Sequence, residues 1–210
     1  MNHDQLKIIF CIIGIVLFFL VMICHKEKKR VKEFFQNLKP KKGINRIDGC
    51  VYINLDNRPD RRKEILKEME KMGIKKENRH RVAGIYIPKN GHKGCTQAHI
   101  LALSIGEMND WDTTLILEDD AEIKIEPQEF NQQIDELLDY LKEKNIKWDV
   151  IMLSTANADK QKLNGTDHVK QIKYATLGTA YIVTKHYLKK LKDLFLKGNS
   201  KMEAVKIGIK

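Results

Sequence analysis

The sequence TLILEDD (residues 114–120) joins an apolar, strand-like run to three consecutive carboxylates. Adjacent anions repel one another, so their position at a strand end is most easily understood if a cation lies there. Mg²⁺ and Mn²⁺ prefer oxygen ligands, and one or two carboxylates often bind them together with substrate phosphates. The stretch therefore predicts a metal site at Glu118, Asp119 and Asp120, with solvated loop acids as the alternative interpretation.

Short β-rich runs alternate with helical patterns on both sides of this stretch. Strands are predicted at residues 50–55, 80–87, 113–117, 148–153 and 178–184. Amphipathic helices are predicted at residues 58–72, 96–108, 127–144 and 186–196. This alternation is typical of an α/β fold, in which helices cover both faces of a mixed, mostly parallel sheet.

Two polar segments follow strands of this predicted sheet. The acids follow residues 113–117, and the segment from Asn54 to Arg58 follows the first strand. In open α/β sheets, ligands bind at the carboxyl ends of strands. We therefore expect the two segments to border one crevice.

The start of the first predicted helix is rich in arginine. Arg58, Arg61 and Arg62 fit a diphosphate or nucleotide there, because guanidinium groups and a helix N-terminus both favour anions. In the alternative interpretation, Asp60 caps the helix and the arginines are solvated.

The N-terminal part of the chain is apolar and then basic. Residues 8–24 carry no charge, and at helical rise they span about 25 Å, which predicts a single transmembrane anchor after a short segment at residues 1–7. A cleaved signal peptide is the alternative, but no small-x-small site follows. Residues 25–48 hold nine Lys/Arg against three acids, or 9 − 3 = +6 of the chain's net charge of +10. We interpret them as a basic tether to a domain at residues 49–210.

Charge and cysteine usage bear on the compartment. The positive cluster after the anchor favours a cytosolic C-terminal domain, with a lumenal domain as the alternative. Cys50 and Cys95 lie outside the apolar segment, without C-x-x-C or zinc-ligand spacing, which agrees with a reducing compartment. A Cys50–Cys95 bridge is left open by the sequence.

Six segments stand in a recognisable order: VYINLDNRPDRR (51–62), RVAGI (81–85), GCTQAHILAL (94–103), LILEDDAEI (115–123), WDVIMLS (148–154) and GTAYIVTKHYLKKL (178–191). In this order they resemble the family-25 glycosyltransferases, the lipopolysaccharide-modifying and collagen β-galactosyltransferase enzymes. The resemblance implies a GT-A-like fold, a UDP-sugar donor, Mn²⁺ or Mg²⁺, and transfer of a hexose to a hydroxyl of a glycan, lipid-linked glycan or protein.

The resemblance also implies roles for individual residues. Asp120 and Glu118 match the acidic metal motif, and Asp120 is the expected catalytic residue. In the family, two segments lie near the nucleotide sugar. The residues of this chain that match them, and that are expected to bind the donor, are Asn54, Arg58, Arg62, Glu118 and Asp119.

Cys95 and His99 match a Gly-Cys-x-x-Ser-His pattern of the family, with Ala98 where Ser is usual. His99 is a further candidate for contact with a phosphate or acceptor hydroxyl, and a structural hydrogen bond is the alternative. Cys95 is expected to be a small core residue rather than a nucleophile.

The catalytic base is the least defined part of the prediction. The family has an Asp-containing segment after the last helix, where this chain offers Glu203; Asp159 and Asp167 are alternatives. A catalytically impaired, glycosyltransferase-like scaffold is therefore a second hypothesis. A metal-dependent nuclease or nucleic-acid binder is a third, but the basic excess is concentrated beside the anchor, so we expect no nucleic-acid partner.

Overall fold

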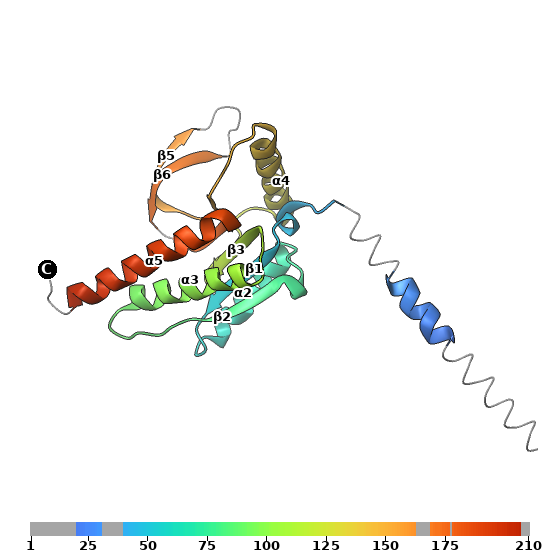
Figure 1. Ribbon diagram of the computed structural model, residues 1–210, viewed down its shortest axis with the longest axis horizontal. Helices are drawn as coiled ribbons and strands as arrows, with labels where there is room; N and C mark the ends of the chain where they lie inside the picture. Colours follow the sequence, from blue (N-terminus) through green and yellow to red (C-terminus); the bar gives the residue numbers. More distant parts are fainter. Residues whose placement is uncertain (1–19, 31–39, 163–168, 177, 207–210) are drawn as a thin grey trace, which may run out of the picture. The chain divides into compact units, whose positions relative to one another are not determined.

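The computed structural model describes residues 20–30, 40–162, 169–176 and 178–206 (Figure 1). The chain divides into two units, Met1–Lys41 and Lys42–Lys210. In the first unit, residues 20–30 are helical and exposed. No helix among the described residues is long and apolar enough to cross a membrane. Most of the predicted anchor, residues 8–19, and residues 31–39 of the predicted tether lie outside the described residues.

The second unit is built on a five-stranded sheet in the order β2-β1-β3-β7-β4. Strand β1 pairs in parallel with β2 and β3, whereas β7 runs antiparallel to β3 and β4. The predicted mixed, mostly parallel sheet is therefore confirmed. Its strands are β1 (Gly49–Asn54), β2 (Arg79–Ala83), β3 (Thr113–Glu118), β4 (Val150–Met152) and β7 (Ala180–Thr184). A separate hairpin, β5 (Ala156–Lys162) and β6 (Lys170–Thr176), was not predicted.

Helices cover both faces of the sheet, as predicted. Side chains alternate along a strand, so Leu115 and Leu117 of β3 pack with one buried cluster and Ile116 with the other. The first cluster includes residues of α2 (Pro59–Lys71) and α4 (Pro127–Glu143). The second includes residues of α3 (Gly91–Met108) and α5 (Lys185–Lys206), which lie side by side in Figure 1.

Several element boundaries differ from the prediction. Helix α3 begins at Gly91, because the side chain of Asn90 accepts a hydrogen bond from the Lys93 amide and caps the helix. Helix α5 continues to Lys206, well beyond the predicted end. Leu101 in this helix is 47% exposed. The apolar contacts of α3 are made instead by Ala98, Ala102 and Leu103.

The compact unit begins at Lys42, so the end of the predicted tether belongs to it. A 3-10 helix, η1 (Gly43–Arg46), packs against α4, and Ile44 and Ile47 are buried in the core. The amide of Gly43 donates to Asp135 Oδ1 at 2.8 Å. A second short turn, η2 (Lys76–Asn78), precedes β2.

Candidate functional site

The carboxyl ends of β1 and β3 lie side by side, because these strands are parallel neighbours with Ile53 opposite Glu118. Asn54, the last residue of β1, is 1% exposed. Its Nδ2 donates to Asp119 Oδ2 at 2.8 Å and to the Arg58 carbonyl oxygen at 3.0 Å. The structure thus brings together the two polar segments that the sequence placed at one edge of the sheet.

The first turn of α2 supplies a cation to this edge. Arg61 Nη1 lies 3.4 Å from Asp119 Oδ1 and 3.6 Å from Asp120 Oδ2. The sequence contained a signal for this contact: Arg61 precedes the buried Ile65 by one helical repeat and so shares the sheet-facing side of α2.

Arg58 and Arg62, the two arginines that the resemblance implies near the nucleotide sugar, differ from Arg61 in their contacts. The Arg58 guanidinium donates to Asp60 from Nε at 3.0 Å and from Nη2 at 2.7 Å. This ion pair lowers the pKa of Asp60 to about 2. Arg62 forms no ion pair with the three acids in the described part of the chain. Of the three arginines that the sequence placed at the start of this helix, Arg61 is therefore the one that pairs with the acids.

Asp120 follows Asp119 in the turn after β3, and its side chain is 50% exposed. Partial burial raises the pKa of this carboxyl, and the charges of Glu118 and Asp119 raise it further, while Arg61 opposes them. Three carboxylates thus compete for limited positive charge at this edge. A divalent cation bound beside Asp120 would relieve that competition, although the oxygens of the three acids do not form a converging ligand group among the described residues.

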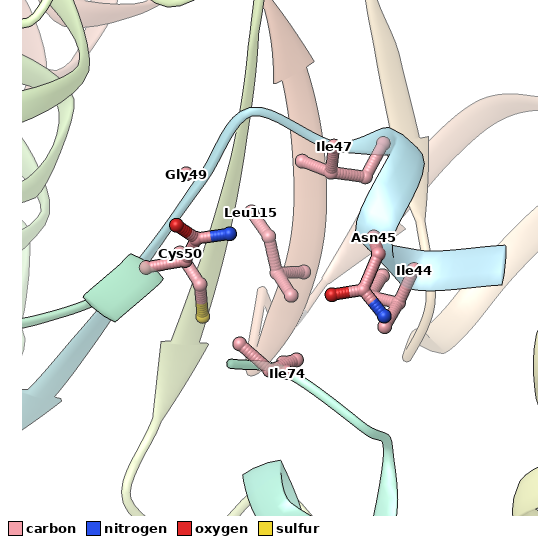
Figure 2. A pocket seen from close by; sticks show the side chains of 8 residues that line it. Ile44, Asn45, Ile47, Gly49, Cys50, Ile74 and Leu115 are labelled. Atoms are coloured by element: carbon pink, nitrogen blue, oxygen red, sulfur yellow. The ribbon is translucent and has the colours of Figure 1, made fainter. Parts of the chain in front are cut away.

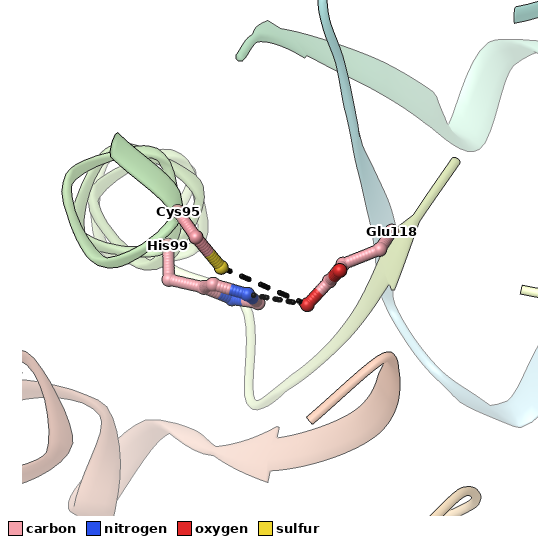
Figure 3. A group of neighbouring side chains, drawn as sticks. All are labelled: Cys95, His99 and Glu118. Atoms are coloured by element: carbon pink, nitrogen blue, oxygen red, sulfur yellow. Dashed lines mark hydrogen bonds and ion pairs between the residues drawn. The ribbon is translucent and has the colours of Figure 1, made fainter. Parts of the chain in front are cut away.

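Glu118 points in another direction, toward α3 (Figure 3). Its Oε1 lies 3.1 Å from His99 Nε2 and 3.9 Å from Cys95 Sγ. One ligand atom from each of the three side chains lies within 4.8 Å of the others. These residues could hold a metal ion, and they do not include Asp120, which the sequence paired with Glu118.

Tyr181 and Phe195 hold the His99 ring in place. The ring is buried, its Nδ1 lies 3.0 Å from the Tyr181 hydroxyl, and it stacks on Phe195 of α5 with 5.6 Å between ring centroids. The structural hydrogen bond considered from the sequence is therefore present, together with the contact to Glu118. Burial and the Glu118 charge raise the pKa of Tyr181, so its hydroxyl stays neutral.

The expectation that Cys95 is a small core residue was wrong. Cys95 is exposed, and it is a free thiol, as is the buried Cys50. Burial of its sulfur and the Glu118 carboxylate raise the pKa of Cys95 to about 11. The missed signal was the spacing of Cys95 and His99, which places both on one side of a helix.

The candidate bases stay predictions. Glu203 lies in the last turns of α5, beyond the Phe195 that stacks on His99. Asp159 is an exposed residue of β5, opposite Tyr174 of β6. Asp167 lies outside the described residues.

A small pocket lies at the opposite end of the strands (Figure 2). Gly49 and Cys50 at the start of β1 line it, and most of its other side chains are aliphatic: Ile44, Ile47, Ile74 and Leu115. The residues that line it include no carboxylate or cation, and it lies at the amino end of β1, whereas the acids lie at the carboxyl end of β3. We therefore place the candidate site at the carboxyl ends of β1 and β3.

Together, the fold and this edge define an α/β protein with an acidic site at the carboxyl ends of parallel strands. A scan against protein-family models gives no match, and a search of curated proteins gives none. We therefore infer function from the site geometry and from the order of the six segments.

Proposed function

We propose that the chain is a metal-dependent glycosyltransferase with a GT-A-like sheet. It moves a hexose from a UDP-sugar to a hydroxyl of a glycan, lipid-linked glycan or protein. The observation that carries the proposal is the meeting of Asn54, Arg61 and the acids at the carboxyl ends of β1 and β3. Such strand ends are where open α/β sheets bind nucleotides, and the six family-25 segments occur in matching order.

The donor diphosphate is bound by cations and by a helix N-terminus. Helix α2 begins at Pro59, and its free amide groups and dipole favour a phosphate. Arg61 is already at this edge, and its fork can bind two phosphate oxygens. Arg58 and Arg62 remain candidates that would have to turn toward the donor.

The predicted Mn²⁺ or Mg²⁺ would be held by Asp120 and Glu118, and the Glu118 side chain would have to turn from His99 toward Asp120. Asp119 is kept in place by Asn54 and Arg61. A divalent cation bound there would supply positive charge to the departing diphosphate. Asp120 is the expected catalytic residue because it is the acid of the three with the most exposed side chain.

The reaction forms a bond between the acceptor oxygen and the anomeric carbon and breaks the bond from that carbon to the diphosphate. The electron pair of the broken bond leaves with UDP, and a carboxylate takes the proton of the acceptor hydroxyl. Glu203 is the proposed base, with Asp159 as the alternative.

A direct test incubates the purified full chain, in detergent, with UDP-sugars and Mn²⁺ and measures UDP binding and release. We expect Asp120→Asn to abolish release and Arg61→Gln to weaken UDP binding by about tenfold or more, since a charged hydrogen bond contributes about 1.5–3 kcal/mol. Lys63→Gln is the matched control, because Lys63 is an exposed cation of the same helix. If no common UDP-sugar is bound or hydrolysed, the proposal fails.

The second candidate is a non-catalytic, glycosyltransferase-like scaffold. One observation favours it: both oxygens of Asp119 are already engaged, by Asn54 and by Arg61. In that case neither Asp119 nor Asp120 acts in catalysis, and a folded chain with both changed to Ala keeps its biological role. A lost role in that double variant would exclude the scaffold.

A further inference from the structure

The cluster of Cys95, His99 and Glu118 contains three different kinds of metal ligand. Cys95 and His99 lie one helical repeat apart on α3, and Glu118 ends the neighbouring β3. The ligand atoms lie within 4.8 Å of one another, and Figure 3 shows all three side chains converging. A thiol, an imidazole and a carboxylate thus meet at one point.

The imidazole is already oriented for binding. Tyr181 holds Nδ1 at 3.0 Å, and stacking on Tyr181 and Phe195 fixes the plane of the ring. Only Nε2 then faces the cluster, 3.1 Å from Glu118 Oε1. Histidines that bind metals are commonly held in this way through their second nitrogen.

The thiol is also within reach of an ion from solvent, because Cys95 is an exposed, free cysteine.

We propose that Cys95 Sγ, His99 Nε2 and Glu118 Oε1 bind a divalent transition metal of intermediate softness, of the Zn²⁺, Co²⁺ or Fe²⁺ class. Sulfur disfavours Mg²⁺ and Mn²⁺, whereas a mixed sulfur, nitrogen and oxygen set is typical of Zn²⁺. The site is distinct in chemistry from the oxygen site of the proposed transferase, although Glu118 contributes to both. It does not depend on glycosyl transfer.

The geometry needs little adjustment. Ligand atoms bound tetrahedrally at about 2.0–2.3 Å from the metal lie roughly 3.3–3.8 Å from one another. The two contacts of Glu118 Oε1, at 3.1 Å to His99 and 3.9 Å to Cys95, are near this range. Cys95 is exposed, so its side chain can rotate to bring Sγ closer to Glu118 Oε1. With three protein ligands, a fourth position on the metal stays open to water or substrate.

The test is a Co²⁺ titration of the reduced full chain in detergent, followed by absorption spectroscopy. We expect a thiolate-to-cobalt charge-transfer band and the visible bands of four-coordinate Co²⁺, both displaced by Zn²⁺ but not by Mg²⁺. Cys95→Ser should remove the charge-transfer band and lower the Co²⁺ affinity by more than about tenfold. The exposed position of Cys95 makes this variant suitable, because its loss should not unfold the core.

Two further variants test whether the band comes from this cluster. Cys24→Ser removes an exposed thiol of the first unit and should leave the band unchanged. Asp120→Asn should leave the band unchanged even if it abolishes UDP release. The cobalt band therefore tests the metal site, and UDP release tests the transferase proposal independently. Absence of the band, or its persistence in Cys95→Ser, would overturn the metal site.

Discussion

Asn54 and Asp119 share a hydrogen bond of 2.8 Å across 65 positions of sequence. The bond joins the end of β1 to the turn after β3, and the other Nδ2 hydrogen is donated to the Arg58 carbonyl oxygen. Asn54 is fully buried, and its Oδ1 has no hydrogen-bond partner among the described residues. One amide therefore positions both the acidic turn and the start of α2.

Replacing Asn54 with Ala should destabilise the domain. The change leaves the Asp119 carboxylate and a carbonyl oxygen without their donor, and losing a hydrogen bond to a charged group costs about 1.5–3 kcal/mol. Urea unfolding of the full chain followed by circular dichroism measures this difference. Asn57→Ala is the matched control, because Asn57 is exposed in the same loop and should change stability by less than about 0.5 kcal/mol. Equal effects of the two changes would contradict the bridging role.

Replacing Asp120 with Asn should slightly stabilise the domain near neutral pH while abolishing metal-dependent UDP release. The folded-state pKa of Asp120 is raised, first by burial and then by Glu118, so its ionised form is disfavoured in the fold. The cost of ionisation is present above the folded pKa and disappears as the pH falls below the ordinary value, where both states are protonated. The side chain is half exposed, so the gain should be below about 0.5 kcal/mol.

The stability difference between Asp120→Asn and the unchanged chain, measured by urea unfolding at several pH values, checks this sign. A gain that persists below the ordinary carboxyl pKa would contradict it.

Much of the fold could be predicted because its signals are local. The apolar run of β3 is visible in the sequence, and so is the apolar stripe of α2. The β5–β6 hairpin was missed because β5 is mostly polar, with residues such as Lys160 and Gln161. A polar strand leaves little pattern to detect.

The site could be predicted only in part. Acids at a strand end are a local signal, and parallel pairing explains why Asn54 meets Asp119. Which way each acid points is decided by tertiary contacts, however, and Glu118 turns toward His99 and Cys95 of α3. Tyr181 was missed because it is far away in the sequence and becomes a neighbour of His99 only through the antiparallel placement of β7.

Replacing Gly94 with Ala should disturb α3 just before Cys95. A Cβ at this position would collide with the backbone carbonyl oxygen of Ile85, which cannot rotate away. Overpacking of this kind costs about 1–3 kcal/mol, and the shift of the helix should also weaken Co²⁺ binding. Gly91→Ala is the control in the same helix, because its Cβ meets open space and should leave stability unchanged or raise it by up to about 1 kcal/mol. Urea unfolding and the cobalt titration give the two readouts.

Replacing Tyr181 with Phe should weaken metal binding without removing a ligand. The hydroxyl lies 3.0 Å from His99 Nδ1 in a buried environment, so its loss leaves that nitrogen unpaired and removes the contact that directs Nε2 toward Glu118. Second-sphere changes of this kind lower metal affinity by about 10–100-fold, and an unpaired buried polar group costs about 1–3 kcal/mol.

The cobalt titration and urea unfolding measure the two effects. Tyr86→Phe controls for loss of a hydroxyl, because Tyr86 is 68% exposed. A Tyr181→Phe variant that loses stability but keeps full cobalt affinity would show that the hydroxyl supports the core alone. Loss of both, with Tyr86→Phe unchanged, is expected if Tyr181 orients His99 toward Glu118.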